Sequence, residues 1–110
     1  ENYPDASNVL KKNIEKFNCE DKSVIINEDV SNDEIESKLI DKKFDIIFLD
    51  PPYKNENFIN VLNKIIDIKL LNKNGIIIIH RSKKTLESLP KNFQIIQIKT
   101  YGISKIIFGY

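Results

Sequence analysis

The sequence predicts an α/β protein with a mostly parallel sheet that ends in an antiparallel hairpin. Short segments rich in valine and isoleucine alternate with amphipathic helical segments, the pattern of repeated strand–helix units. Four consecutive isoleucines at residues 76–79 are typical of a strand covered by helices on both faces. A glycine-containing turn between two strand-like segments near the end predicts the hairpin. At 110 residues, 41% of them apolar, the chain is expected to form one domain, residues 1–110.

Charge is distributed unevenly along the chain. Residues 1–55 carry 8 basic and 13 acidic side chains, a net charge of −5, whereas residues 56–110 carry 9 and 3, a net charge of +6. The overall charge of +1 excludes a disordered acidic tail and a wholesale polybasic binder. An acidic half beside a basic half suits a site that holds a cationic cofactor near a polyanion.

The cysteine, histidine and apolar content indicates an intracellular chain without a metal. The single Cys19 excludes an intrachain disulfide, and no Cys/His cluster has metal-ligand spacing. The longest apolar runs have four residues, far below the roughly 20 that span a bilayer. No secretory signal pattern begins the sequence. We therefore expect no metal, no membrane and a cytoplasmic location, or an organellar one if the source is a eukaryote.

The first half of the chain predicts a helix, a strand and a second helix. Residues 5–17 place apolar side chains at three- and four-residue spacings, and Pro4 is tolerated in a first helical turn. Residues 23–27 predict a short Val/Ile strand. Ser31 and Glu34 match a capping box, which predicts a helix to about residue 41.

The second half predicts two strands joined by a helix, followed by the hairpin. Residues 44–49 are β-branched and aromatic, and this strand must end at Asp50 because two prolines follow. A helix is expected at residues 56–69, with a stop at residues 72–75 before the strand at residues 75–80. Three elements complete the prediction: a helical turn at residues 84–89 and strands at residues 93–99 and 104–109.

The richest chemistry lies in Asp50-Pro51-Pro52-Tyr53. Ligands of open α/β sheets bind beyond the carboxyl ends of the strands, which is where this loop falls. Two proline rings make it stiff, and the Asp50 side chain and the Pro51 carbonyl can each accept one N–H of an exocyclic amine. Those two hydrogen bonds direct the nitrogen lone pair at an electrophile. Tyr53 offers a surface on which a nucleobase stacks.

These residues resemble motif IV, [Asn/Asp/Ser]-Pro-Pro-[Tyr/Phe/Trp], of amino-methyltransferases that use S-adenosylmethionine. Four stretches together resemble the RsmD family, which methylates guanine N2 of small-subunit ribosomal RNA: ENYPDASNVLKKNI, DIIFLDPPYK, NGIIIIHRSK and KTYGISKIIFGY. The resemblance spans essentially the whole chain. It implies a partial Rossmann-like class I methyltransferase fold, S-adenosylmethionine as cofactor, and ribosomal RNA or the small ribosomal subunit as partner.

The resemblance also implies roles for individual residues. Glu1 matches the acid that accepts from the cofactor ribose, Asp29 matches the acid near its adenine, and Asp50 faces the cofactor as well as the substrate amine. Asp50, Pro51, Pro52 and Tyr53 form the catalytic loop, and the target nucleotide is presented out of its stack. Further basic residues are implied as RNA contacts: Lys54, Arg81, Lys83, Lys84, Lys99 and Lys105.

Two departures from the family pattern stand out. The glycine-rich loop after the first strand is absent, because the only glycines are Gly75, Gly102 and Gly109. The chain therefore resembles the C-terminal portion of a methyltransferase domain, and we expect it to bind the cofactor weakly or not at all by itself. In the family sheet order 3-2-1-4-5-7-6 it lacks strands 1 and 2, which the missing part of the domain or a second chain completes. The other departure is His80, where relatives commonly carry glutamate.

Several alternatives stay open at this point. The Pro-Pro loop is also compatible with a rigid turn that has no catalytic role, and Asp29 with an acidic residue of a turn. Glu1 is also compatible with a frayed chain terminus. His80 is also compatible with a hydrogen-bonded histidine at a strand end, and the basic residues with a solvent-exposed face. A receiver domain phosphorylated on Asp50 is a second class of function, although the residues after the fifth strand do not fit it. An adenine-N6 methyltransferase shares the same loop chemistry, and an inactive fragment is compatible with the sequence.

Overall fold

The computed structural model describes residues 1–26, 34–52, 54 and 57–110. It divides into two compact units, Glu1–Ile35 and Glu36–Tyr110, which are described separately below. Asp29, Tyr53 and the proposed cap at Ser31 lie outside the described residues.

The first unit contains α1 (Pro4–Lys16) and the short 3₁₀ helix η1 (Glu20–Lys22). Pro4 stands at the start of α1, Asp5 lies in its first turn and Lys16 in its last, so the proline and both charges occupy the helix ends that favour them. The helix predicted at residues 5–17 is confirmed within one residue at each end.

The strand predicted at residues 23–27 is wrong for the part that the structure describes. Residues 23–26 have no regular secondary structure, and the carbonyl of Ile26 accepts a hydrogen bond from the amino group of Glu1 at 3.1 Å. A strand persists when a neighbouring strand satisfies its backbone groups. None of the described strands pairs with this segment, so its Val/Ile content alone does not make it a strand.

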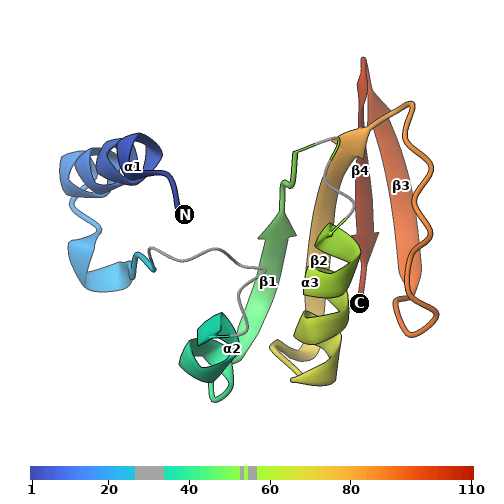
Figure 1. Ribbon diagram of the computed structural model, residues 1–110, viewed down its shortest axis with the longest axis horizontal. Coiled ribbons are helices and arrows are strands. Elements are labelled where there is room, and N and C mark those ends of the chain that lie inside the picture. The colour runs from blue at the N-terminus through green and yellow to red at the C-terminus, as the bar shows by residue number, and fades with distance from the viewer. Residues whose placement is uncertain (27–33, 53, 55–56) are drawn as a thin grey trace. The chain divides into compact units, whose positions relative to one another are not determined.

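The second unit is built around a four-stranded mixed sheet with the order β1-β2-β4-β3. After α2 (Glu34–Leu39), whose start precedes this unit, the elements are β1 (Phe44–Leu49), α3 (Phe58–Asp67), β2 (Leu71–Ser82), β3 (Ile95–Tyr101) and β4 (Ser104–Gly109). The β1–β2 pair is parallel, and the β2–β4 and β3–β4 pairs are antiparallel. Strand β1 lies at one edge and β3 at the other (Figure 1). The predicted α/β fold with a terminal antiparallel hairpin is confirmed.

The core of this unit lies between α3 and one face of the sheet (Figure 1). Phe58, Leu62 and Ile65 recur on one stripe of α3, and Ile77 and Ile79 alternate on β2. Side chains alternate between the faces of a strand. The next buried position of β2 after Ile79 is therefore residue 81, so the Arg81 side chain lies on the same buried face of the strand.

The predicted bounds of β2, α3 and β3 differ from the structure, in which β3, predicted at residues 93–99, is Ile95–Tyr101. Strand β2 begins at Leu71, because residues 72–75 form an irregularity within the strand and not a stop before it. The α3 helix ends earlier, at Asp67, and Lys69 follows with a left-handed φ of 55°. This conformation terminates a helix as a C-cap does. The strand at residues 75–80 is otherwise present as predicted.

The helical turn predicted at residues 84–89 is absent. One turn closes when Thr85 donates its backbone N–H to the Ser82 carbonyl at 3.1 Å, and residues 85–90 continue without helix. The Glu87 side chain instead contacts Arg81 of β2 and Lys105 of β4, whereas Leu86 is fully exposed. The hairpin is confirmed: Gly102, with a φ of 57°, occupies the turn between β3 and β4, where glycine carries no steric penalty.

Candidate active site

The Pro-Pro loop leaves the sheet at the carboxyl end of β1. The parallel register pairs Leu49 with Ile79, so Asp50 and His80 are the next residues of two adjacent strands. The Asp50 side chain is 56% exposed and stands at the sheet edge where ligands of open α/β sheets bind. The two prolines end the ladder because they lack an N–H. A strand end, a carboxylate and a rigid turn thus coincide at one place.

A line of hydrogen bonds connects Asp50 to β4 through His80. The Nδ1 of His80 lies 2.8 Å from the Oδ1 of Asp50, and its Nε2 lies 2.9 Å from the Oγ of Ser104. Ser104 begins β4, which pairs with β2. Sequence reasoning missed these contacts. The signal that could have found the first is the parallel pairing of two strands that end at Asp50 and His80.

Arg81 is the main correction to the predicted RNA contacts. It is only 2% exposed, and its guanidinium lies 4.5 Å from the ring centre of Phe58 in α3. Its Nη1 donates to the carbonyl of Pro52 at 3.1 Å and to that of Pro51 at 3.4 Å. A buried guanidinium with these partners does not face a phosphate. It supports the Pro-Pro loop from inside the protein.

Glu87 neutralises this buried cation. Its Oε1 accepts from the Nε of Arg81 at 3.0 Å, and its Oε2 pairs with the Nζ of Lys105 at 2.7 Å. Thr85 also donates its hydroxyl to Glu87. Burial raises the pKa of Glu87, but the hydrogen bonds from Lys105, Thr85 and Arg81 together lower it by more, so that its pKa lies below the usual 4.5. Lys105 is only 15% exposed and its ammonium group is paired with Glu87. Its predicted role as an RNA contact is therefore corrected as well.

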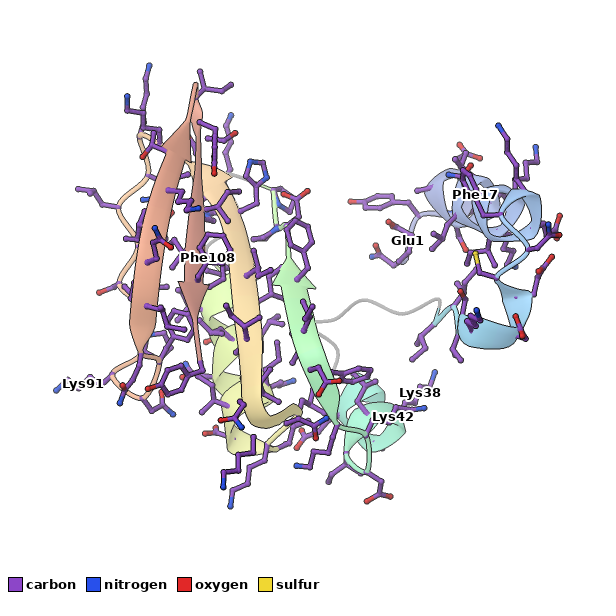
Figure 2. The ribbon with its side chains drawn as sticks, turned by 180° about the vertical axis from the view of Figure 1, so that it is seen from behind. Glu1, Phe17, Lys38, Lys42, Lys91 and Phe108 are labelled. Carbon is purple, nitrogen blue, oxygen red and sulfur yellow. The ribbon has the colours of Figure 1, made fainter. Side chains whose placement is uncertain are left out.

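The other lysines predicted to contact RNA are exposed. Lys54, Lys83, Lys84 and Lys99 are all exposed in the second unit, which suits phosphate contacts. Lysines also stand at the other end of the sheet: Figure 2 shows Lys38 and Lys42 near the start of β1, and Lys91 at the same end on the β3 side. Lysine density alone therefore does not mark an RNA-binding face.

Glu1 belongs to the first unit and is exposed. Its carboxylate accepts the backbone N–H of Tyr3 at 3.0 Å, just before α1 begins. This bond uses one oxygen lone pair, and an ionised carboxylate has about four acceptor positions. Glu1 thus retains the capacity to accept further hydrogen bonds.

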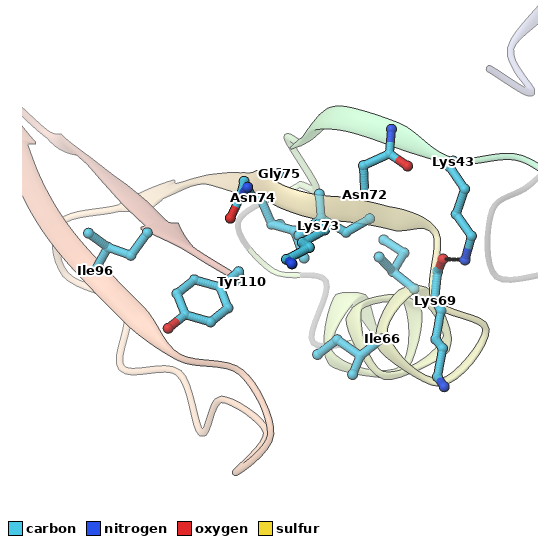
Figure 3. A pocket seen from close by; sticks show the side chains of 12 residues that line it. Lys43, Ile66, Lys69, Asn72, Lys73, Asn74, Gly75, Ile96 and Tyr110 are labelled. Carbon is cyan, nitrogen blue, oxygen red and sulfur yellow. Dashed lines mark hydrogen bonds between the residues drawn. The ribbon is translucent and has the colours of Figure 1, made fainter.

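A separate groove opens at the opposite end of the sheet. It has a volume of about 870 Å³ and is lined by Lys43, Lys73 and Tyr110 among others. Figure 3 shows these side chains around the amino end of β2, where the Nζ of Lys43 donates to the Lys69 carbonyl. Neither Asp50 nor the prolines line this groove. It is not part of the candidate active site.

Within the part of the chain that the structure describes, no three His, Cys, Asp or Glu side chains gather as metal ligands do. In the same residues no helix has the length and apolar character needed to cross a bilayer. The Asp50 end of β1 presents hydrogen-bond acceptors, namely one exposed carboxylate and two proline carbonyls. Each of them accepts a hydrogen bond from a side chain of β2, His80 or Arg81.

The sheet order and the Pro-Pro loop at the carboxyl end of β1 together define a partial methyltransferase fold of the Rossmann-like class. The order β1-β2-β4-β3 corresponds to strands 4-5-7-6 of that fold. A receiver domain has a parallel sheet, so the antiparallel β4 beside β2 argues against that alternative. The chain belongs to the family described as conserved hypothetical protein 95, whose profile matches residues 1–110.

Curated relatives carry methyltransferase names. The ribosomal RNA small subunit methyltransferase D of Haemophilus influenzae is 26% identical over 98 residues, covering 89% of this chain and 51% of the relative. Its namesake in Buchnera aphidicola is 32% identical over 90 residues, covering 82% and 46%. The chain thus spans about half the length of these two relatives. The predicted resemblance to the RsmD family is confirmed.

Solved structures show the same fold. A putative methylase from Haemophilus influenzae superposes with a TM-score of 0.77 at 24% identity, covering 99% of this chain and 68% of the other. A conserved hypothetical protein from Streptococcus pyogenes gives a TM-score of 0.79 at 26% identity, with 99% and 67% covered. Both place the α/β architecture described above within larger proteins.

Proposed function

We propose that residues 1–110 are the C-terminal portion of one methyltransferase domain that acts on small-subunit ribosomal RNA in the cytoplasm. The reaction is methyl transfer from S-adenosylmethionine to the exocyclic N2 amine of a guanine. The observation that carries the proposal is the exposed Asp50 carboxylate followed by two prolines at the carboxyl end of β1. The names of the curated relatives support the ribosomal RNA substrate.

The Asp50 carboxylate and the Pro51 carbonyl orient the amine in this proposal. Each accepts one amine N–H, which leaves the nitrogen lone pair directed at the methyl donor. The Pro51 carbonyl already accepts from Arg81 at 3.4 Å, but a carbonyl has two lone pairs and retains one for the substrate. Catalysis then comes mainly from positioning, since oriented reactants gain several orders of magnitude in rate.

The proposed cofactor contacts are carboxylates: Glu1 for the ribose, Asp29 for the adenine side and Asp50 near the reacting centre. Glu1 and Asp50 are exposed and keep acceptor capacity, which fits ribose hydroxyls and a sulfonium cation. S-adenosylmethionine supplies the electrophilic methyl group when bound. All three glycines, Gly75, Gly102 and Gly109, lie after α3 in the sequence, so the glycine-rich backbone cradle for the methionine part is not among these residues. We therefore expect residues 1–110 alone to bind the cofactor weakly; micromolar affinity by calorimetry would contradict this.

The proposed RNA contacts lie in and after the Pro-Pro loop and just after β2. We propose that the target base leaves its stack and packs on Tyr53, since enzymes that modify a base must reach it outside the stack. Lys54, Lys83 and Lys84, all exposed, then contact phosphates. The proposal involves no metal and no membrane.

The test is to incubate the longest natural chain containing these residues with labelled S-adenosylmethionine and unmethylated small ribosomal subunits. The RNA is digested and the labelled nucleoside identified. N2-methylguanosine is the expected product. N6-methyladenosine would retain the role of Asp50 but replace guanine by adenine as the substrate. No label in any RNA would contradict the proposal as a whole.

A further inference from the structure

The bond between Asp50 and His80 has a definite direction. An ionised carboxylate only accepts hydrogen bonds, so the Nδ1 of His80, 2.8 Å from Asp50, must carry the proton. A neutral imidazole has one donor and one acceptor nitrogen. Its Nε2, 2.9 Å from the Oγ of Ser104, then accepts the hydroxyl proton. The donors thus run from Ser104 to His80 to Asp50, an assignment that follows from the partners of each group.

The fold makes this line rigid. His80 and Ser104 lie on the paired strands β2 and β4, where the register sets Ser82 opposite Ser104 and places His80 diagonally from it. The His80 side chain is 24% exposed, against 56% for Asp50. The histidine is therefore the better-buried partner, fixed at both nitrogens, and the carboxylate is the one presented to solvent. One oxygen of Asp50 is held, which leaves the rest of the carboxylate to face a ligand.

We propose that His80 is a positioning residue for Asp50, and that Ser104 acts through it by fixing the imidazole tautomer. This inference rests on the proposed function, since it assigns to His80 the orientation of the carboxylate that accepts the substrate amine. Without the Nδ1 donor, the carboxylate rotates about its side-chain torsions and its free oxygen leaves the direction of the amine. With the other tautomer, an Nδ1 lone pair would face the carboxylate and repel it.

The chain offers a matched pair of variants that separates the two nitrogens. An asparagine amide places its N–H near the position of Nδ1, whereas a glutamine amide reaches the position of Nε2. His80→Asn therefore keeps the donor to Asp50 and loses Ser104, and His80→Gln does the reverse. If His80 only linked neighbouring strands, the asparagine variant would not be expected to retain more activity than the glutamine variant.

The experiment measures steady-state methyl transfer by the full-length chain on small ribosomal subunits. We expect kcat of His80→Asn to stay within about threefold of the parent and kcat of His80→Gln to fall about 10- to 100-fold, with KM for RNA changed less than twofold, because misplacing a group by about an ångström costs about this much. Equal kcat in the two variants would overturn the inference. Thermal unfolding of both variants checks that neither loss reflects failure to fold; if His80→Gln does not fold, Ser104→Ala replaces it, and kcat equal to that of the parent would then overturn the inference.

A second readout needs neither substrate nor cofactor. The ¹⁵N shifts of the His80 ring, assigned by comparison with His80→Asn, should report Nδ1 protonated at neutral pH in the parent and a mixture of tautomers in Ser104→Ala. An Nε2-protonated ring in the parent would contradict the inference directly. Asp50→Ala separates the two proposals: if it is as active as the parent, the proposed function of the loop fails. If it is inactive while His80→Gln keeps its kcat, only the role of His80 fails.

Discussion

Arg81 donates from one guanidinium nitrogen to the carbonyls of both Pro51 and Pro52, at 3.4 and 3.1 Å. A loop without backbone N–H groups cannot hold itself by a ladder, and its carbonyls need donors from elsewhere. The buried guanidinium provides them, and Glu87 balances its charge. The shape of the candidate catalytic loop therefore depends on a residue that does not face the substrate.

Replacing Arg81 with methionine should destabilise the protein. The substitution keeps the apolar stem but removes the donors to the proline carbonyls and leaves Glu87 with less compensation. We expect the free energy of unfolding in urea to fall by about 3 kcal/mol, as for other broken buried ion pairs. The control is Lys83→Met, an exposed lysine, which should change it by less than about 0.5 kcal/mol. A loss below about 1 kcal/mol for the arginine variant would contradict the account.

Arg81→Lys tests the geometry separately from the charge. Lysine keeps a cation near Glu87 but presents no planar fork that reaches the carboxylate and both carbonyls together. We expect this variant to fold and to show a lower kcat, because the loop is less well positioned. Unchanged kcat and KM would show that the fork does not support the loop.

Glu87 should make the free energy of unfolding depend on pH. Its pKa is lowered in the folded protein, so its contribution is complete well above the usual pKa of 4.5 and is lost as the pH falls through the lower folded value. The difference in unfolding free energy between the parent and Glu87→Gln should therefore shrink below pH 4.5. The exposed Asp67→Asn serves as control. A difference that stays constant from neutral pH to about pH 3 would contradict the prediction.

Lys83 and Lys84 should contribute to RNA affinity through phosphate contacts. Replacing both with glutamine should weaken binding of the full-length chain to ribosomal RNA and reduce the slope of log affinity against log salt by up to about two. Lys38→Gln with Lys42→Gln, at the other end of the sheet (Figure 2), is the matched control and should leave the slope unchanged. Equal slopes for the two double variants would remove Lys83 and Lys84 from the interface.

Tyr53 should act on substrate binding more than on chemistry. Loss of base stacking in Tyr53→Ala costs roughly 1–3 kcal/mol, so KM for RNA should rise about 5- to 150-fold, while Tyr53→Phe keeps the ring and stays near the parent. The measurement is steady-state methyl transfer with varied RNA. If kcat and KM of the alanine variant match those of the parent, the ring does not stack on the base.

Much of this arrangement could be predicted from the sequence, because local patterns determine it. The strand at Phe44–Leu49 ends where two prolines forbid further pairing, and the structure has the same bounds. The segment at residues 23–26 could not be predicted in the same way, since a strand depends on partners elsewhere in the fold.

The buried network was harder to predict, because lysine and arginine are ordinarily surface residues. A signal for Arg81 exists nonetheless: it follows Ile77 and Ile79 at the two-residue spacing of a buried strand face. Glu87 gives a second signal, as one of only three acids among residues 56–110. A lone acid in a basic segment is a natural partner for a buried cation.

The role of Asp50 is the central claim, and single-turnover methyl transfer tests it most directly. The full-length parent is compared with Asp50→Ala and Asp50→Asn at saturating S-adenosylmethionine and ribosomal subunits, with cofactor affinity measured in parallel. We predict that the alanine variant loses about 100-fold or more in the rate of transfer, keeps most of its cofactor affinity, and is partly rescued in the asparagine variant, whose amide oxygen still accepts the amine. A rate for Asp50→Ala equal to that of the parent would contradict the account.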